Sequence, residues 1–340
     1  MKNTLLLSIV ILSITCSCRQ SQEPKESKTI LSEEEYYIVD TLVNSFPENY
    51  VRNLQKVPAS NKMDITSYKD LLDLFQELVY TEEAWKAGLR LVPRIYLTSI
   101  GSRWGSKTSK EITVEYKKRI FFRGIAPLIL YANEGIMSDR NRLERLRKDL
   151  LQNDSLFWTD EIWLMRLARL YKVKAPESRE TEALFDELWK KVDIIPASLA
   201  LAQGAVESGW GTSRFAAKGN ALYGQWSWGD DAMIPEAQRK ELGNYGIAAF
   251  PSLQESVCAY MLNLNTHPAY AELRAIRAEL REKGEKPTGD ILADGLIRYS
   301  EKGPSYIHTL KNMMEHNHLA PLDEAVFSND PPLYLIPVAK

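Results

Sequence analysis

A glutamate at the end of an apolar segment is the residue of this sequence best placed to do chemistry. Residues 197–208 are mostly strong helix formers, with Pro196 suited to the first turn of a helix and Gly209 suited to its end. We therefore expect Glu207 in the last turn, where the helix dipole and apolar neighbours both disfavour its charged form. Both effects raise a carboxyl pKa, as a general acid that protonates a glycosidic oxygen near neutral pH requires. The alternative is a carboxylate that only caps the following turn.

Polar and aromatic residues around this helix supply the other parts of a sugar-binding cleft. Gln203 lies one turn before Glu207 on the same helix face, within hydrogen-bonding reach. A glycine-punctuated loop follows, in which Asn220 and Gln225 are suited to hydrogen-bond acetamido or hydroxyl groups. Aromatic faces are platforms for the apolar side of a sugar ring, although core packing is the better explanation for any single tryptophan. Among the aromatic residues Trp210, Tyr223, Trp226, Trp228 and Tyr245, we expect Trp210, Tyr223 and Trp226 to line the cleft.

The order and spacing of these residues resemble a known family. The run Glu-Ser-Gly-Trp-Gly-Thr-Ser-Arg-Phe at 207–215, followed by Gly-Asn-Ala-Leu-Tyr-Gly at 219–224, resembles the glucosaminidase domain of family 73 glycoside hydrolases, close to the Bax-like branch. Weaker similarity continues through 250–260, 267–270 and 299–306, and an upstream helical stretch at 118–133 also fits. The resemblance covers roughly residues 110–320 and leaves the first hundred unexplained.

The resemblance implies a fold, a reaction and a substrate. The fold is mainly α, a lysozyme-like helical catalytic domain with a small β-hairpin or loop lobe, preceded by a helical N-terminal domain. The reaction is hydrolysis of the β-1,4 bond after N-acetylglucosamine in peptidoglycan glycan strands, with Glu207 matching the family's general acid and no cofactor. A tyrosine also contributes in the family, and the Tyr-Ser-Glu context favours Tyr299 over Tyr306.

The second catalytic group is open. Many family members place a carboxylate some thirty to forty residues after the acid, and this interval holds Asp230, Asp231, Glu236 and Glu241. We favour Glu236, which follows the aromatic loop and a proline, with Glu241 close behind. The separation of the two carboxylates would distinguish a water-activating base from a nucleophile. A third route, attack by the substrate's own acetamido group, needs no second carboxylate.

Other functions fit the same residues. A catalytically weak protein that binds or scaffolds the cell wall would keep the cleft without a competent second group. Within enzymes, the alternatives are a muramidase, a lytic transglycosylase or an amidase of wall peptides. The reducing end of the product distinguishes these activities from a glucosaminidase.

The N-terminus has the pattern of a bacterial export signal. Lys2 precedes an apolar run at 4–15, which is too short to span a membrane as a helix. The run ends in Thr-Cys-Ser-Cys, and a small residue before a cysteine resembles a lipobox, where the cysteine is acylated and becomes the first residue of the mature chain. Cys18, preceded by serine, fits better than Cys16, preceded by threonine. We expect a lipid anchor at Cys18 and a periplasmic or cell-envelope location; an ordinary cleaved signal is the alternative.

Hydrophobic periodicity divides the remainder into helices. Apolar residues recur at helical spacing in 70–80, 160–171 and 181–191, and 117–133 looks helical but is interrupted by Pro127. Gly, Ala and aromatic residues concentrate after residue 196, so a domain boundary is expected near 180. The expected organisation is a signal peptide at 1–17, a flexible tether at 18–35, a helical N-terminal region at 36–180, the glucosaminidase domain at 181–325 and a C-terminal tail at 326–340.

Composition and residue counts exclude other classes. With 340 residues, 44% hydrophobic and 26% charged, the chain suits about two folded domains, and its formal net charge of −2 argues against nucleic acid as a partner. Three cysteines do not make a disulfide scaffold, and Cys258 lies at helical spacing with apolar residues, as a small buried side chain would. His316 and His318 have no acidic or thiol companions at a useful spacing, so we expect no metal.

Overall fold

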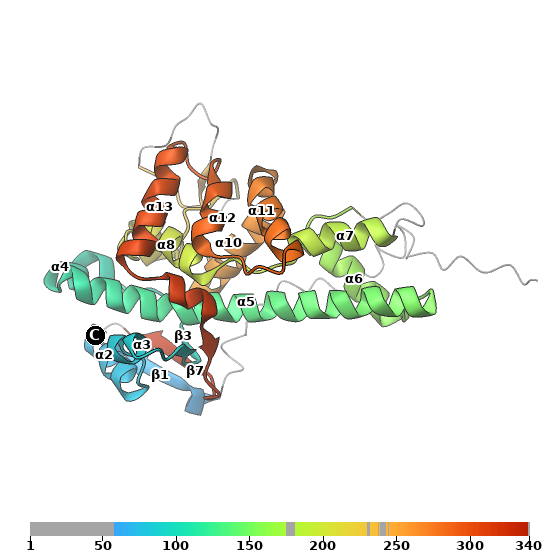
Figure 1. Cartoon of the computed structure of the whole chain (residues 1–340). Helices are drawn as coiled ribbons and strands as arrows, with labels where there is room; N and C mark the ends of the chain where they lie inside the picture. The colour runs from blue at the N-terminus through green and yellow to red at the C-terminus, as the bar shows by residue number, and fades with distance from the viewer. Residues whose placement is uncertain are drawn as a thin grey trace, which may run out of the picture.

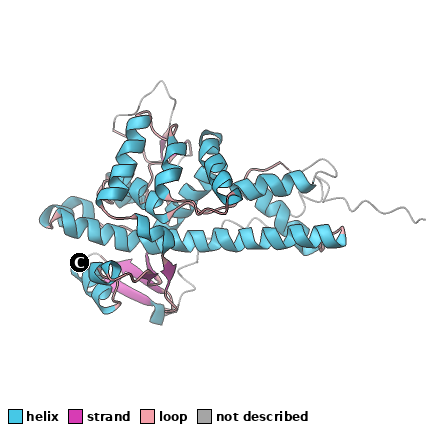
Figure 2. Ribbon diagram, in the orientation of Figure 1, coloured by secondary structure: helices cyan, strands magenta, loops and turns pink. Residues whose placement is uncertain are grey.

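The computed structural model describes residues 58–174, 181–229, 232–236, 238, 243 and 245–338. Within them the protein is mainly helical, which confirms the expected fold class. One long helix, α5, runs through the middle of the molecule (Figure 1). Helices α8 and α10 to α13 lie on one side of it, and a small sheet with α2 and α3 lies on the other (Figure 2). The expected signal peptide, tether and Cys18 lie outside the described residues.

The elements before residue 196 mix strands with helices. They are a 3-10 turn at Ala59–Asn61, β1 (Lys62–Ile65), α2 (Tyr68–Glu77), α3 (Glu82–Lys86), β2 (Leu91–Val92), β3 (Ile95–Leu97), a π-helical turn at Trp104–Thr108, α4 (Ser109–Glu111), α5 (Val114–Asn153), α6 (Trp158–Leu170) and α7 (Thr181–Lys191). The N-terminal region, expected to be helical, therefore also contains strands.

The elements after residue 196 are mostly helices. They are α8 (Ala197–Ser208), α9 (Arg214–Gly219), β4 (Trp226–Ser227), β5 (Gly246–Ile247), α10 (Leu253–Thr266), η6 (Pro268–Tyr270), α11 (Ala271–Glu282), α12 (Gly289–Ala293), η7 (Asp294–Leu296), α13 (Pro304–His316), η8 (Ala320–Glu324), β6 (Val326–Phe327) and β7 (Leu333–Pro337). Strands β4 and β5 pair antiparallel and form the small β lobe that the sequence led us to expect.

The last described strand joins the beginning of the described chain. Strand β7 lies between β1 and β3 and is parallel to both, with Tyr334 opposite Lys62 on one side and Tyr96 on the other. The stretch that we expected to be a tail therefore pairs with strands of the N-terminal region: β6 with β2, and β7 with β1 and β3. The two ends of the described chain are thus paired in one sheet, on the same side of α5.

Helix α5 is continuous where the sequence suggested an interruption. It begins after Thr113, whose side chain accepts a hydrogen bond from the Tyr116 N–H, and ends at Asp154 in the left-handed conformation. Its 40 residues span about 60 Å. Pro127 lies buried inside it, although proline removes one helical hydrogen bond. Packing of both halves of α5 against other elements offsets this loss, because tertiary burial contributes most of a helix's stability.

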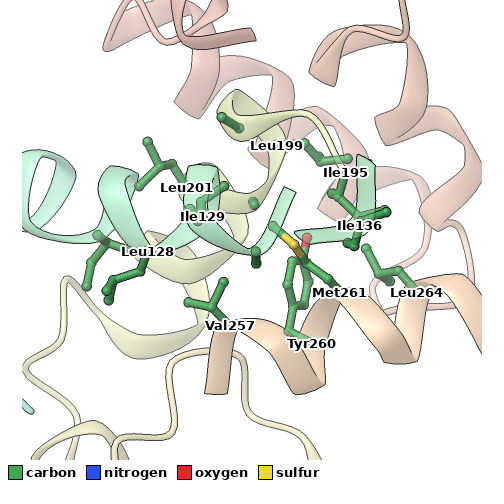
Figure 3. Packing of buried hydrophobic residues seen from close by; sticks show 14 of the residues in the cluster. Leu128, Ile129, Ile136, Ile195, Leu199, Leu201, Val257, Tyr260, Met261 and Leu264 are labelled. Atoms are coloured by element: carbon green, nitrogen blue, oxygen red, sulfur yellow. The ribbon is translucent and has the colours of Figure 1, made fainter. Parts of the chain in front are cut away.

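The core around α8 fixes the helix that carries Glu207. Figure 3 shows side chains of three helices interleaved: Leu128, Ile129 and Ile136 from α5, Leu199 and Leu201 from α8, and Val257, Tyr260, Met261 and Leu264 from α10. Every residue of α8 from its start to Ala205 is buried. A helix enclosed in this way holds its last turn rigidly against the neighbouring helices.

The segment that leads into α8 is held by a buried ionic cluster. The Asp193 carboxylate accepts hydrogen bonds from the Arg281 guanidinium at 2.9 and 3.0 Å. Nitrogens of Arg140 and Arg277 lie 3.7 and 3.8 Å from Asp193 Oδ2. Both arginines also donate to backbone carbonyls of this segment, including those of Val192 and Asp193. The cluster therefore pairs its buried charges and satisfies the backbone before the helix begins.

The start of α8 shares a cap with α12. Asp323 accepts hydrogen bonds from the Ser198 N–H at 2.8 Å, the Ser198 hydroxyl at 2.7 Å and the Gly289 N–H at 3.0 Å. A side chain at position 289 would lie 2.1 Å from Ser198 Oγ, so the two helix starts meet only because Gly289 has none. One carboxylate thus joins two helix N-termini, where negative charge is favourable.

Among the described residues, no helix is long and apolar enough to cross a membrane.

Candidate functional site

Glu207 lies in the last turn of α8, as the sequence predicted. Gly209 follows at φ 56° and ends the helix. Glu207 Oε1 accepts a hydrogen bond from the Tyr306 hydroxyl at 2.7 Å. Burial raises the pKa of the Glu207 carboxyl, and the Tyr306 hydrogen bond and the charge of Lys302 only partly oppose it. The carboxyl is thus pushed toward the protonated form that a general acid needs.

A chain of hydrogen bonds extends from Glu207 into the core. Tyr260 Oη donates to Gln203 Oε1 at 2.6 Å, and Gln203 Nε2 donates to Tyr306 Oη at 3.1 Å. An amide nitrogen can only donate, so the Tyr306 hydroxyl oxygen accepts the hydrogen bond from Gln203. The hydroxyl proton of Tyr306 is therefore free to point to Glu207. The chain fixes both the position of Tyr306 and the direction of its hydrogen bond.

Gln203 belongs to this chain and is fully buried. Sequence reasoning places it among the groups that bind substrate, whereas the structure places it behind Tyr306 and away from the surface. Its proximity to Glu207 was predicted from the helical spacing. Its partner Tyr260 was not, since Tyr260 lies on α10 and nothing in its local sequence marks it.

Stacked tyrosines surround the chain. The ring of Tyr299 stacks on Tyr306 at 5.5 Å between centroids, and Tyr223 stacks on Tyr260 at 3.7 Å. The Tyr299 hydroxyl donates to the backbone oxygen of Tyr223 at 3.0 Å. Thus Tyr306, the residue ranked second, contacts Glu207, and Tyr299 supports the ring of Tyr306. Tyr223 is buried, so its ring packs in the wall of the site and exposes little area to a ligand.

The turn after α8 directs Trp210 onto α5. Trp210 has φ 63°, and its backbone oxygen accepts a hydrogen bond from the Trp104 indole at 2.9 Å. Its ring packs edge-on against Phe121 and Phe122, at 5.9 and 5.2 Å. The Lys118 ammonium lies 5.5 Å from the ring centroid. Trp210 is half-buried and joins the site to α5 while keeping part of its surface exposed.

The loop lobe presents the most exposed aromatic surface near this site. Trp226 on β4 stacks on Tyr245 at 4.5 Å and is 46% exposed, and Trp228 beside it is 66% exposed. Two such rings standing out from a hairpin suit a sugar face better than core packing. Gln225 Oε1 is buried and has no hydrogen-bond partner among the described residues. This oxygen is thus not exposed to a ligand, although a buried acceptor without a partner is unusual.

Asn220, which we expected to bind substrate, holds parts of the backbone together in the structure. It ends α9 in the left-handed conformation at φ 51°. Its amide nitrogen donates to the Phe250 oxygen at 3.0 Å, and its amide oxygen accepts from the Ile100 N–H at 3.4 Å. Both ends of the side chain are therefore engaged by the protein, and they tie the glycine-rich loop to two other segments.

The candidates for the second catalytic group lie in or near the loop between β4 and β5. Glu236 is 90% exposed, and its carboxylate lies 3.8 Å from Arg214 Nε. Asp230, Asp231 and Glu241 lie outside the described residues. In the described part of the chain, no group of three or more His, Cys, Asp and Glu side chains is arranged to hold a metal ion.

Comparisons with known proteins point to one family. A family model described as "Mannosyl-glycoprotein endo-beta-N-acetylglucosaminidase" matches residues 182–319, which include Glu207, Tyr306 and the β4–β5 lobe. A relative called "Protein bax", from Escherichia coli (strain K12), is 35% identical over 204 residues, or 59% of this chain and 70% of the relative. No solved structure gives a significant match.

Proposed function

Since the chain belongs to the Bax-like proteins that carry a glucosaminidase domain, we propose that it is an endo-β-N-acetylglucosaminidase that hydrolyses peptidoglycan. The bond cleaved is the β-1,4 bond after N-acetylglucosamine. Glu207 is the general acid, and the glycan strand lies along the surface that runs from Trp210 to the exposed rings of Trp226 and Trp228.

The observation that carries this proposal is the environment of the Glu207 carboxyl. Tyr306 occupies Oε1 as a donor, so the acidic proton resides on Oε2. Oε2 faces Gly224, where an added side-chain carbon would stand 3.7 Å away, and the glycine leaves this approach open. The proton on Oε2 is donated to the glycosidic oxygen as the bond to the sugar breaks. The hydrogen bond from Tyr306 then stabilises the carboxylate that is left.

The water that completes hydrolysis needs a second group. We propose Glu236, which lies in the same lobe as the exposed tryptophans. A separation of about 6.5–9.5 Å from Glu207 with substrate bound would make it a base for an inverting reaction, and about 5–5.5 Å would make it a nucleophile for a retaining one. Attack by the acetamido group of the substrate is the alternative, and a Glu236→Gln variant with full activity would favour it.

The N-terminal sequence adds a location to the proposal. Acylation at Cys18 would hold the enzyme on a bacterial membrane, close to its polymer in the periplasm or cell envelope. The tether at 18–35 would let the catalytic domain reach the glycan. Metabolic labelling with a fatty acid tests this: wild type takes up the label and Cys18→Ser does not, whereas loss of label only in Cys16→Ser would move the anchor.

Product analysis tests the activity directly. Purified peptidoglycan is digested with wild type and with Glu207→Gln, and the released fragments are identified by mass spectrometry after reduction. Reducing-end N-acetylglucosamine, released by wild type and absent with the variant, is the expected result. Reducing-end N-acetylmuramic acid, an anhydro sugar or free peptides would instead assign a muramidase, a lytic transglycosylase or an amidase. If both chains release equally negligible amounts of product, the protein is instead one that binds the cell wall without cleaving it.

A further inference from the structure

A pocket separate from the proposed glycan surface lies where the N-terminal region meets the end of the glucosaminidase domain. It has a volume of about 500 Å³ and is bounded by α3, the N-terminal half of α5, the last residue of α13 and the segment 317–322 that follows it. In Figure 1, α3 and the lower end of α13 lie on opposite sides of this half of α5. We call it the α5 pocket. The family model matches residues 182–319, so most of the residues in the pocket wall lie outside the matched range.

Cations predominate in the wall of the α5 pocket, although the whole chain is slightly acidic. Its basic residues are Lys86, Arg90, Lys118, Arg119 and Arg123, and its acidic residues are Glu82 and Glu115. The net charge of the whole chain is −2, so the positive charge in the pocket wall does not simply reflect an excess of basic residues in the sequence.

Three of these cations are engaged by the protein. Lys86 pairs with Glu82 at 2.6 Å, and Arg119 pairs with Glu115 at 2.9 Å. Arg90 donates to the Trp85 backbone oxygen at 2.7 Å. Carboxylates compensate the charges of Lys86 and Arg119, and a neutral carbonyl holds the Arg90 side chain in place, so we assign the binding role to the remaining two cations.

The other two cations have no such partner among the described residues. Within the described part of the chain, no carboxylate lies within ion-pair distance of Lys118 or Arg123. Instead, Lys118 lies 5.5 Å from the ring centroid of Trp210, and Arg123 lies 5.8 Å from that of Tyr80. Both side chains are only partly exposed. A half-buried cation without a counter-ion is costly, and a bound anion would offset that cost.

The α5 pocket adjoins the proposed glycan surface. Lys118 and Phe122 line the pocket, and both contact the ring of Trp210. Trp210 is three residues after Glu207, so their backbones are at most about 11 Å apart. Trp210 therefore links the turn after Glu207 to Lys118 in the wall of the α5 pocket.

We propose that Lys118 and Arg123 bind a carboxylate of the peptide that peptidoglycan strands carry on their N-acetylmuramic sugars, a proposal that rests on the proposed function. The glycan itself offers neutral hydroxyl and acetamido groups at its cleavage site, whereas the peptide supplies anions at regular intervals along the strand. The N-terminal region then contributes substrate recognition, and strands that still bear peptides are preferred over bare strands.

Binding measurements on two forms of the polymer test this. Binding of the full-length Glu207→Gln chain is measured on immobilised strands of intact peptidoglycan and on immobilised strands from which an amidase has removed the peptides. The lactyl carboxylates that this hydrolysis frees on the stripped strands are blocked as neutral methylamides. The expected Kd for intact polymer is about tenfold lower than for stripped polymer. The Lys118→Gln/Arg123→Gln variant should bind both forms with the Kd that the parent chain shows for stripped polymer. Lys110→Gln/Lys117→Gln, which removes as much charge outside the pocket, should behave as the parent chain, and Lys118→Arg/Arg123→Lys should restore the preference.

The outcomes separate this inference from the proposed function. If wild type cleaves intact and stripped strands and the parent chain binds both equally, the peptide assignment fails and the proposed function stands. If the parent chain binds neither and wild type cleaves neither, both fail. Equal binding to the two polymers, combined with binding to phosphatidylglycerol vesicles that requires Lys118 and Arg123, would overturn the peptide assignment in favour of a lipid headgroup.

Discussion

Helix α8 has a carboxylate near each end, the buried Asp193 and the half-buried Glu207, and the two differ in every respect that matters for chemistry. Asp193 precedes the helix among three arginines, and Glu207 ends it among tyrosines. Burial raises the pKa of Asp193, but Arg277, Arg281 and Arg140 outweigh it and hold that pKa below the usual value. Burial likewise raises the pKa of Glu207, and there the opposing influences are too weak to reverse it.

The difference is the one expected between a structural carboxylate and a reactive one. Asp193 is surrounded by permanent cations and backbone partners, so it stays charged and holds the entry to α8. Glu207 has a single neutral donor on Oε1 and a glycine beside Oε2, so it can lose and regain a proton. The same helix is thus anchored by one carboxylate and leaves the other available.

The largest effect is expected from Glu207→Gln. The amide keeps the shape of the side chain but cannot donate a proton to the glycosidic oxygen, so kcat should fall by about 10³- to 10⁴-fold. Release of reducing ends from peptidoglycan measures it. Circular dichroism of the variant should match wild type, and substantial remaining activity would remove Glu207 from the role of acid.

Asp193→Asn should act on stability and not on chemistry. It leaves three arginines around a neutral side chain, and removing one partner of a buried ionic cluster costs about 3–5 kcal/mol. Urea denaturation measures the loss. Because the pKa of Asp193 is lowered on folding, its contribution is complete above about pH 4 and is lost as pH falls through the folded-state value. The folded variant should keep its kcat; a fall in kcat comparable to that of Glu207→Gln would contradict the division of roles.

Tyr306→Phe should have an intermediate effect on catalysis. The hydroxyl contributes a hydrogen bond to a carboxylate, worth about 1.5–3 kcal/mol, so kcat should fall by about 10- to 100-fold. Loss of this donor also raises the pKa of Glu207 further, and the alkaline limb of the rate profile should move to higher pH. Tyr299→Phe is the matched control, since its hydroxyl bonds to a backbone oxygen and not to Glu207. A shift of the limb in Tyr299→Phe and none in Tyr306→Phe would reverse the assignment of the two tyrosines.

The smallest effect is a gain in stability from Glu207→Gln at neutral pH. A carboxyl whose pKa is raised on folding destabilises the protein above its unfolded value, about 4.3, and the cost grows until the folded pKa is passed. The free energy of unfolding of the variant should therefore exceed that of wild type by about 1 kcal/mol at pH 7, the usual gain when an unfavourable active-site group is replaced. Near pH 3 the two free energies should be equal. Thermal unfolding at the two pH values measures this. A variant less stable than wild type at pH 7 would show that the carboxylate is stabilising.

The local parts of the site were predictable from the sequence. Pro196, the helix formers and Gly209 place α8 correctly, and the spacing of Gln203 and Glu207 puts them on one face. These are effects of neighbouring residues, which sequence patterns report well. The antiparallel lobe was expected from the family resemblance and not from a local pattern.

The long-range parts were not predictable in this way. Tyr260 and Tyr306 meet Gln203 only after α10 and α13 pack against α8, and no local pattern encodes that contact. Strand β7 pairs in parallel with strands more than 230 residues away, and Pro127 suggested a helix end that packing overrides. The preference for Tyr299 over Tyr306 rested on sequence context alone, and in the structure it is Tyr306 that donates a hydrogen bond to Glu207.

The most direct test of the contrast between the two carboxylates is the pH dependence of kcat/KM on peptidoglycan fragments. Because Glu207 must be protonated to act, the alkaline limb reports its pKa in the free enzyme. We predict a limb clearly above the value of about 4.3 for a free glutamate, retained in a folded Asp193→Asn variant and moved upward in Tyr306→Phe. A rate that is flat between pH 5 and 8, or a limb unaffected by Tyr306→Phe, would contradict Glu207 as the acid.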